Sequence, residues 1–233
     1  MLIAIISDIH GNLEALMRVF EDMDALGIDR IVCLGDIIGY GADPSACLSL
    51  IRRRVPLVLM GNHEEATFNP ATREWFSAIA RHAIEWTIRH LSEEERAWIR
   101  QLPYTTSFEG SRFVHAAPKH PERWDYVMGR FEALTQAEAF SERLCFIGHS
   151  HIAGLFPLEP NVRKYNTENR FLINPGSVGQ PRDGDPRASY GILDTVAGTY
   201  ENRRVSYPIH ITARKIRSAG LPPFLADRLS MGH

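Results

Sequence analysis

The sequence predicts an α/β fold, and two observations support that prediction. Over the first 60 residues, short apolar runs alternate with amphipathic segments, as in a βαβαβ unit with parallel strands. Later segments are shorter and more strand-like, and we expect them to form a second, more antiparallel sheet. The chain has 233 residues, of which 44% are hydrophobic. This is enough for one large core, so we expect a single domain over residues 1–233.

The βαβαβ unit is predicted from the first part of the chain. Residues 2–7 form a continuous apolar run, which is typical of a strand buried on both faces. Asn12 can cap the helix that follows, and Gly27 can end it. The expected elements are strands over residues 2–7, 31–34 and 56–60, and helices over residues 13–26 and 44–53. Right-handed connections would make these strands parallel, so their carboxyl ends meet at the edge where ligands bind in open α/β sheets.

A helical cover is predicted over about residues 68–102. Apolar side chains at helical spacing, Trp75 among them, predict a first helix over about residues 69–91. Ser92 and Glu95 form a capping box for a second helix. We expect this helical pair to cover one face of the sheet.

Shorter elements are predicted in the second half of the chain. A hairpin is expected over residues 105–108 and 112–115, and the Pro-rich segment 116–130 after it is long enough to be a lid. Beyond it we expect a helix from about residue 134, strands near residues 144–147, 154–158, 171–173, 189–193 and 200–207, and a helical tail over about residues 211–230. The tail is predicted as two short helices separated by Gly220-Leu-Pro-Pro.

Composition argues against several partners. The formal net charge is −2 and the isoelectric point is near 6.6, so no basic excess attracts a nucleic-acid polymer or an anionic membrane. Cys33, Cys47 and Cys145 lie far apart in apolar stretches, as reduced core thiols do. Met1 is not followed by a basic leader, and no apolar run approaches the roughly 18 residues of a membrane span. We therefore expect a cytoplasmic protein without a membrane partner. Its oligomeric state is not predicted.

Residues of the types that bind metals stand at the predicted ends of strands. Five of the ten histidines do so, together with two aspartates and an asparagine. They are Asp8, His10, Asp36, Asn62, His63, His115, His149 and His151. Imidazoles, carboxylates and an amide oxygen together suit borderline divalent ions such as Mn, Fe, Zn or Co. The array therefore predicts a dinuclear metal centre at the carboxyl edge of the sheet.

Taken singly, each of these residues has a simpler explanation. Asp8 and His10 lie two residues apart on one side of an extended segment, which alone is weak evidence for a metal. Gly35-Asp36 is more often a turn, Asn62 could cap a helix, and each histidine could be a satisfied core residue. Their joint occurrence in one order, each at a strand end, favours the metal centre. Within it, the Asp36 carboxylate could bridge two cations.

The same segments resemble a known family. The motifs SDIHGN, GDIIGYG, GNHE, VHAAP and GHSH closely resemble the calcineurin-like metallophosphoesterase superfamily, in particular the small prokaryotic branch of YfcE-type phosphodiesterases and diadenosine tetraphosphatase-like proteins. The resemblance extends over nearly the whole chain, since residues 174–183 and the closing Ala-Gly-Leu-Pro also match that branch. It implies a four-layer α/β/β/α sandwich of two mixed sheets flanked by helices, the metallo-dependent phosphatase fold.

The resemblance also implies a role for each residue of the array. One metal would be held by Asp8, His10 and His151, the other by Asn62, His115 and His149, and Asp36 would bridge them. His63 would be an unligated catalytic imidazole. Glu64 stands where many members carry Asp, and its longer carboxylate could still orient His63.

A reaction follows from two divalent transition-metal ions, Mn foremost, with Fe, Zn, Co or Ni as alternatives. Held roughly 3.5 to 4 Å apart, they would let a bridging hydroxide attack phosphorus while both ions stabilise charge on the phosphoryl oxygens. His63 would donate a proton to the leaving oxygen or stabilise the transition state, or else be only a structural histidine. We expect a phosphoesterase acting on a small phosphodiester or a nucleotide phosphoanhydride.

Other functions stay open on the same fold. One is a phosphomonoesterase, including a protein phosphatase, and another is a catalytically silent scaffold that binds proteins. Retention of every ligand and of His63 argues against the scaffold. The acidic charge balance disfavours a nuclease that acts on polymers.

Four residues are candidates for substrate contacts. Arg182, between Gly179 and Gly184, could donate two hydrogen bonds to a phosphate, although a loop salt bridge explains it equally well. His120, Trp124 and Tyr126 follow His115 in the Pro-rich loop, where rings could stack on a nucleobase or an aryl ester. The alternative is that Trp124 and Tyr126 pin the loop to the core.

Overall fold

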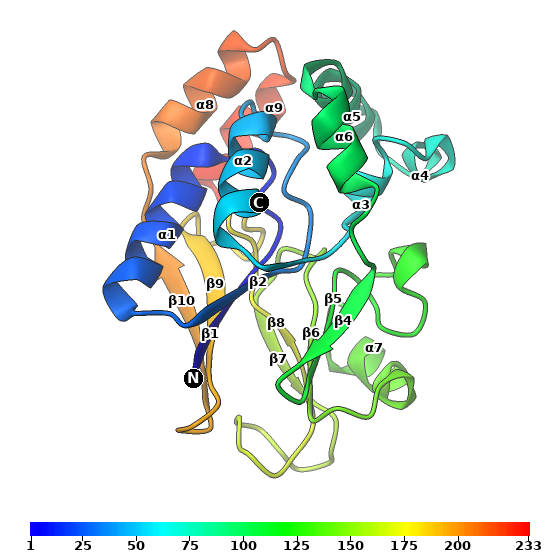
Figure 1. Ribbon diagram of the computed structural model, residues 1–233, viewed down its shortest axis with the longest axis vertical. Coiled ribbons are helices and arrows are strands. Elements are labelled where there is room, and N and C mark those ends of the chain that lie inside the picture. The colour runs from blue at the N-terminus through cyan, green and yellow to red at the C-terminus, as the bar shows by residue number, and fades with distance from the viewer.

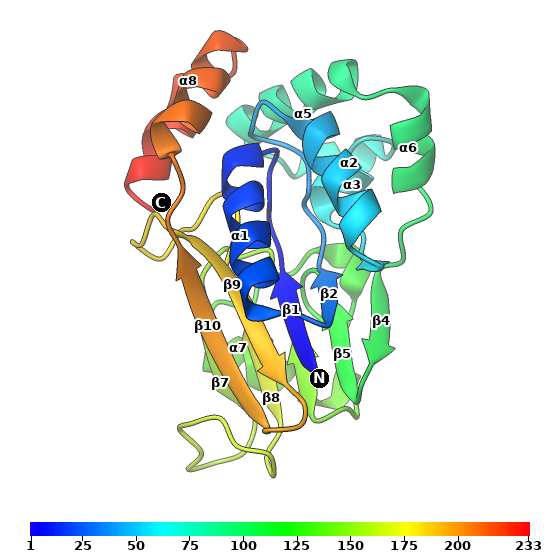
Figure 2. The ribbon, with the colours of Figure 1, turned by 60° about the vertical axis from the view of Figure 1, so that its left-hand side comes forward.

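Two five-stranded sheets form the centre of the computed structural model, which describes residues 1–233. The first sheet has the order β10-β9-β1-β2-β3, and the second has the order β4-β5-β6-β8-β7 (Figures 1 and 2). The first contains β1 (Leu2–Ile6), β2 (Arg30–Cys33), β3 (Leu57–Val58), β9 (Ala188–Asp194) and β10 (Thr199–Val205). The second contains β4 (Thr105–Phe108), β5 (Ser111–Val114), β6 (Leu144–Phe146), β7 (Gly154–Pro157) and β8 (Phe171–Asn174).

The predicted βαβαβ unit is confirmed. β1 pairs in parallel with β2, and β2 pairs in parallel with β3. The helix between the first two strands, α1 (Leu13–Leu26), begins where the Asn12 side chain accepts a hydrogen bond from Ala15 N, and ends at Gly27, whose φ is 67°. The second connecting helix is α2 (Pro44–Arg54). β3 is shorter than expected because only its two residues pair with β2.

The prediction that the late strands build a second, more antiparallel sheet is wrong in two respects. β9 and β10 belong to the first sheet, where β9 pairs antiparallel with the free edge of β1. The second sheet instead has a parallel centre, β5-β6-β8, with antiparallel β4 and β7 at its edges. Residues 188–193 of β9 are all buried, which suits an internal strand between β1 and β10.

Four layers are built from these sheets, as the family resemblance implied. Alternate residues of β1 face opposite sides, because side chains along a strand alternate. Ile3 and Ile5 pack against the second sheet, in a cluster with Phe113, Phe146 and others. Ala4 and Ile6 belong to another cluster, together with buried residues of α1 and α2. On the far side, β6 and β8 contribute to a third cluster with α7 (Arg130–Thr135).

The helical cover departs from the prediction in its bounds and position. The expected first helix is divided into α4 (Pro70–Glu74) and α5 (Ala78–His90), and Trp75 between them is 90% exposed. The capping box of α6 (Glu93–Ile99) is confirmed. α5 packs against α2 and the C-terminal helices rather than lying flat on a sheet, so the cover extends the helical layer beyond the strand ends (Figure 2).

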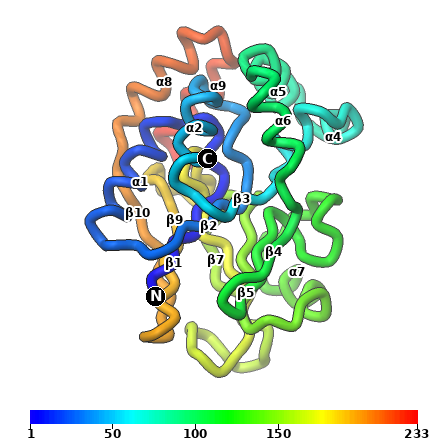
Figure 3. Tube along the Cα trace, in the orientation of Figure 1, coloured from blue at the N-terminus to red at the C-terminus, as the bar shows by residue number.

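The remaining elements surround the two sheets. The predicted hairpin of β4 and β5 is confirmed, and the helix expected from residue 134 begins four residues earlier, at Arg130. The predicted tail is confirmed as α8 (Ile209–Ser218) and α9 (Pro223–Asp227). Single-turn helices cover Asn62–Glu65 (α3), Pro121–Arg123 (η1), Ala137–Ala139 (η2) and Arg228–Ser230 (η3). The long connection from β7 to β8 lies at the opposite end of the molecule from α5 and α8 (Figure 3).

Two further expectations concern cysteines and membrane spans. Cys33, Cys47 and Cys145 are buried and free, as expected. No helix has both the length and the apolar character needed to cross a bilayer.

Candidate metal centre

All seven residues predicted as metal ligands follow strands of the two sheets at one edge. Asp8 and His10 follow β1, Asp36 follows β2, and Asn62 begins α3, the next element after β3. His115 follows β5, and His149 and His151 follow β6. Both sheets have parallel strands here, so their carboxyl ends bring these segments together from distant parts of the chain.

The side chains form two groups that share one carboxylate. Within each group the ligand atoms lie within 4.8 Å of one another, and every member is buried. The first group is Asp8, His10, Asp36 and His151, and the second is Asp36, His115 and His149. Asn62 adjoins the second group, with its Oδ1 3.2 Å from His115 Nε2. Asn62 is not the cap of α3, since Gly61 holds that position.

Most of these residues have an unusual backbone conformation. Asp8, His10, Asp36, His149 and His151 all have φ between 50° and 66°. Non-glycine residues rarely adopt this left-handed region, and each instance costs of order 1–3 kcal/mol. Such outliers cluster at functional sites, where the surrounding structure enforces them. The strand ends are therefore turned sharply so that alternate side chains point to one centre.

The two histidines of the first group are oriented so that their free nitrogens face each other. His10 Nδ1 lies 3.0 Å from Ile38 O, and His151 Nδ1 lies 2.7 Å from Gln180 O. A carbonyl oxygen only accepts hydrogen bonds, so Nδ1 carries the proton in both rings. Their Nε2 atoms, which then carry lone pairs, are 3.0 Å apart. Burial lowers the pKa of both rings well below the usual value, so neither gains a second proton to relieve this contact.

His115 in the second group is surrounded by oxygen atoms. Its Nδ1 faces Leu34 O at 3.2 Å, and its Nε2 lies 3.4 Å from Asp36 Oδ2. Burial opposes a charge on this ring, but the carboxylates of Asp36, Asp8 and Glu64 together outweigh burial and raise the pKa of His115 to about 9. The surroundings of His115 Nε2 thus favour a positive charge. A proton on Nε2, or a cation between Nε2 and Asp36 Oδ2, would supply it.

The donor set fits divalent cations. Buried carboxylates cost free energy unless they are paired or coordinate a metal, and Asp8 and Asp36 are almost completely buried. A cation between His10 Nε2 and His151 Nε2 would turn a repulsive contact of lone pairs into two metal bonds. The hydrogen bonds from Nδ1 to carbonyl oxygens are the usual support of metal-binding histidines. Each group mixes imidazole and carboxylate, which suits transition metals better than Mg²⁺ or Ca²⁺.

Comparisons with known proteins agree with this site. The sequence profile described as the calcineurin-like phosphoesterase superfamily domain matches residues 1–198. The chain belongs to this superfamily. The chain is therefore a metal-dependent phosphoric ester hydrolase, a metallophosphoesterase.

Individual relatives extend the match to the full length of this metallophosphoesterase. It is 39% identical to the uncharacterized protein MJ0912 of Methanocaldococcus jannaschii, over 99% of this chain and 98% of that protein. A crystal structure of a metallophosphoesterase from Sphaerobacter thermophilus is 38% identical and superposes with a TM-score of 0.89, covering 100% of this chain and 99% of the other. The hypothetical protein PH1004 of Pyrococcus horikoshii shares the fold, with a TM-score of 0.81 at 18% identity and coverage of 100% and 98%.

His63 lies beside the metal groups of the metallophosphoesterase but belongs to neither. Its main-chain N donates to Asp36 Oδ1 at 2.9 Å, and its ring centroid is 4.8 Å from that of His10. Burial lowers the pKa of His63 to about 4, so the ring is neutral at pH 7. Gly39, with φ of 87°, lets the backbone approach this ring, because a Cβ there would lie 2.1 Å from His63 Nδ1. The imidazole is thus held tightly without a hydrogen bond to Nδ1.

Glu64 acts on the Asp36 segment rather than on the His63 ring. Its two carboxylate oxygens accept hydrogen bonds from the main-chain N–H groups of Asp36 (2.6 Å), Ile37 (2.8 Å) and Ile38 (3.2 Å), and also of Gly61 (3.1 Å). It makes no hydrogen bond with His63. The buried carboxylate therefore ties the loop after β2 to the start of α3, and this fixes the position of Asp36.

Glu64→Gln is expected to weaken metal binding without removing a ligand. The carboxamide NH₂ would face N–H donors, leaving at least one of them unsatisfied, at a cost of about 1–3 kcal/mol. Loss of these hydrogen bonds should displace Asp36 and lower metal affinity about 10- to 100-fold. Losses of this size occur in other metal sites when a residue that orients a ligand is replaced. Calorimetric Mn²⁺ titration and urea unfolding measure the two effects, with Glu94→Gln on the exposed surface as control. Unchanged affinity in Glu64→Gln would contradict this role.

A cavity of about 690 Å³ adjoins the metal groups through Asn62 and His149. Trp124 and Tyr126, both predicted as substrate contacts, line it in different ways. Trp124 Nε1 donates to Glu65 Oε2 at 2.9 Å and its ring packs against the core, so Trp124 does anchor the loop. Tyr126 is 53% exposed and stacks on His149, with ring centroids 4.0 Å apart. Tyr126 thus offers an open ring face beside the metal centre.

The other two substrate candidates differ in position. His120 is exposed and does not line the cavity. Arg182 lies beside the metal centre, since its main-chain N donates to His151 O at 3.1 Å and its guanidinium carbon is 5.9 Å from the centroid of the Tyr40 ring. The predicted alternative, a loop salt bridge, is not formed by Arg182. The carboxylate of its neighbour Asp183 pairs instead with Arg204.

Two residues of the site were missed from the sequence. Tyr40 packs on His10 and His63, with centroid distances of 4.6 Å to each ring, and it lies within the GDIIGYG motif. Glu65 is buried, lines the cavity and accepts hydrogen bonds from Thr72, Tyr104 and Trp124. No local pattern points to Glu65, because its partners are distant in the sequence.

Proposed function

We propose that this protein hydrolyses a small phosphodiester or a nucleotide-type phosphoanhydride with two divalent transition-metal ions, of which Mn²⁺ is the first choice. The observation that supports it best is the sharing of Asp36 between two groups of ligand atoms. Asp36 Oδ2 faces both groups, 3.6 Å from His10 Nε2 and 3.4 Å from His115 Nε2, so this carboxylate could serve two cations while the remaining ligands divide between them. We propose Asp8, His10 and His151 for one ion, and Asn62, His115 and His149 for the other.

The chemistry supplied by the ions is that of two-metal hydrolases: they activate the attacking hydroxide and neutralise charge on the phosphoryl oxygens. The protein contributes position and hydrogen bonds. His63, neutral at pH 7 because burial lowers its pKa to about 4, retains one N–H that can donate to the leaving oxygen. Arg182 can donate to a non-bridging phosphoryl oxygen. Tyr40 and Phe76, both packed on the His63 ring, exclude water from it.

A small substrate is supported by the cavity next to His149. Its volume of about 690 Å³ suits a nucleoside or aryl group, and Tyr126 can stack on either. Three acidic residues, Glu65, Glu122 and Asp125, line the same cavity against one basic residue, Arg123, so a group with hydrogen-bond donors fits better than a second anion there. For a phosphodiester, we therefore propose that the nucleoside or aryl alcohol that leaves occupies this cavity.

Hydrolysis of bis-p-nitrophenyl phosphate tests the proposal. Chelator-treated protein should be inactive, and activity should return on addition of Mn²⁺, with two ions bound per chain by elemental analysis. Saturating metal should also raise the free energy of unfolding, by about 2.7 kcal/mol at a concentration of 100 Kd. The ratio to p-nitrophenyl phosphate separates diesterase from monoesterase activity. No turnover with Mn, Ni, Co, Zn or Mg in protein that binds two ions would refute the proposal and favour a protein-binding scaffold.

A further inference from the structure

The cavity that adjoins the metal groups is rich in aromatic side chains. Four of its 13 lining residues are tryptophan, tyrosine or phenylalanine, against 9% of the whole chain. They are Trp75, Phe76, Trp124 and Tyr126. Asn62 and His149, two of the predicted metal ligands, line the same cavity. The rings therefore lie beside the place where a phosphoryl group would meet the metals.

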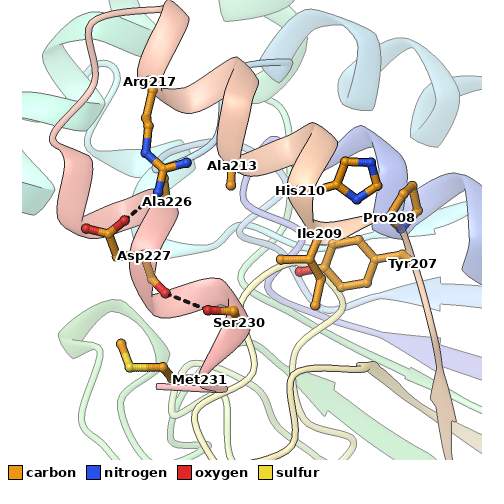
Figure 4. A pocket seen from close by; sticks show the side chains of 10 residues that line it. All are labelled: Tyr207, Pro208, Ile209, His210, Ala213, Arg217, Ala226, Asp227, Ser230 and Met231. Atoms are coloured by element: carbon orange, nitrogen blue, oxygen red, sulfur yellow. Dashed lines mark hydrogen bonds and ion pairs between the residues drawn. The ribbon is translucent and has the colours of Figure 1, made fainter.

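The groove between α8 and residues 226–231 differs from this cavity (Figure 4). It has a volume of about 590 Å³, and Tyr207 is its only tryptophan, tyrosine or phenylalanine. Its charged residues Arg217 and Asp227 form an ion pair with each other. No predicted metal ligand lines this groove. The aromatic cavity is therefore the better candidate for contacts with a substrate that is held at the metal centre.

Three of the four rings in the cavity have a partner within the protein. Phe76 and Tyr126 pack on histidine rings, with centroid distances of 4.7 Å and 4.0 Å. Trp124 donates a hydrogen bond from Nε1 to a buried carboxylate. The fourth ring, that of Trp75, is 90% exposed and belongs to none of the apolar clusters. A planar group bound in the cavity would bury part of this ring, and burial of apolar surface is favourable.

The segment that carries Trp75 is fixed by a buried carboxylate. Trp75 directly follows α4, in which the Thr72 hydroxyl donates a hydrogen bond to Glu65. Glu65 also accepts the hydrogen bond from Trp124. One carboxylate thus joins α4 to the loop that carries Trp124 and Tyr126. Trp75 is therefore held at the cavity by the fold, although its own side chain is exposed.

We propose that Trp75 is a specificity-determining residue, which stacks on a planar ring in the leaving alcohol of the substrate. This inference rests on the proposed function. It assigns to one side chain the choice of a nucleoside or aryl leaving group over an aliphatic alcohol or a sugar without a base. Stacking on an aromatic side chain is open to every base, because each base has a π-face. The excess of acidic residues in the cavity favours a base with amino donors, such as adenine.

AMP and ribose 5-phosphate test this assignment, since they differ only in the base. Both are titrated as competitors of bis-p-nitrophenyl phosphate with the full chain and excess Mn²⁺. AMP should bind the wild type about tenfold more tightly or better, and Trp75→Leu should weaken AMP binding about fivefold or more, as expected for one stacked base. Ribose 5-phosphate should bind Trp75→Leu and the wild type equally. Trp75→Phe should retain part of the preference for AMP because it keeps a ring.

Tryptophan fluorescence gives a second readout that needs no turnover. Trp75 is exposed, whereas the other three tryptophans are partly buried, so AMP should quench the Trp75 emission and ribose 5-phosphate should not. Trp86→Phe is the matched control, because Trp86 stacks on His90 and does not line the cavity. This control should keep both the preference for AMP and the quenching.

Calorimetric titration of both probes into the Mn²⁺-loaded protein gives the same affinity ratio without hydrolysis. Failure of the proposed function is thereby distinguished from failure of this inference. Trp75 variants should fold as the wild type does, since the side chain is exposed. An equal affinity of the wild type for both probes, or an unchanged affinity of Trp75→Leu for AMP, would overturn the inference.

Discussion

Asp36→Asn should lower kcat/KM for bis-p-nitrophenyl phosphate by about 10³-fold or more, the range seen when a main source of transition-state charge stabilisation is removed. Asp36 is the residue common to both ligand groups, and its Oδ2 lies 3.6 Å from His10 Nε2 and 3.4 Å from His115 Nε2. A carboxamide carries no charge and offers only one oxygen. The variant should therefore bind fewer ions, rather than bind two ions and turn over slowly.

Elemental analysis and a Mn²⁺ titration accompany the kinetics for this variant. Asp194→Asn removes a carboxylate at the opposite end of the first sheet and serves as control, with activity expected within twofold of wild type. Asp36→Asn also keeps one acceptor for His63 N, so the backbone of α3 should stay in place. Retention of two ions together with activity within tenfold of wild type would show that Asp36 is not the shared ligand.

His63→Gln should lower kcat by about 10²- to 10⁴-fold, as expected for loss of a positioned proton donor. Metal content should not change, because the His63 ring belongs to neither ligand group. KM should change little, since the ring is buried and does not line the cavity. This combination separates a role in chemistry from a role in holding metal or substrate.

Kinetics and elemental analysis of the same preparation are the measurements for His63→Gln. His82→Gln, on the exposed side of α5, is the matched control and should behave as wild type. Gln fills much of the imidazole volume between Tyr40 and Phe76, which limits loss of stability. A decrease in kcat of less than tenfold, with metal retained, would assign His63 to structure alone.

Much of the site could be predicted from the sequence because its residues follow parallel strands. The carboxyl ends of such strands share one edge, so a histidine or an aspartate at each end is placed there by topology alone. This argument anticipated that Asp8, His10, Asp36, Asn62 and His63 lie at one edge. His115 was expected at a strand end of a more antiparallel sheet, and the parallel pairing of β5, β6 and β8 brings it to the same edge. The four layers were predicted from the family resemblance. Their physical basis is the alternation of side chains along β1, since Ile3 and Ile5 face the second sheet whereas Ala4 and Ile6 face the helices.

Other features could not be predicted, since they depend on partners distant in the sequence. β9 is a short apolar strand whose sequence suits the interior of either sheet. Only its antiparallel pairing with the free edge of β1 shows that it belongs to the first sheet. Glu64 stands next to His63 in the sequence, yet its carboxylate binds the main chain of residues 36–38. Trp124 and Tyr126 are two residues apart, but only Trp124 has a buried carboxylate, Glu65, within hydrogen-bonding distance.

The sequence by itself determined the parallel βαβαβ unit and the set of metal-binding residue types, because strand periodicity, helix caps and ligand chemistry are local properties. Tertiary structure alone decided which nitrogen of each histidine is free, since this depends on carbonyl groups such as Ile38 O and Gln180 O that fold against the rings. It also placed Gly184 N 3.0 Å from Gly232 O, although these residues are 48 positions apart in the chain. Hydrogen bonds and charges act through space over a few ångströms, and only the packing of the two sheets and the tail sets those distances.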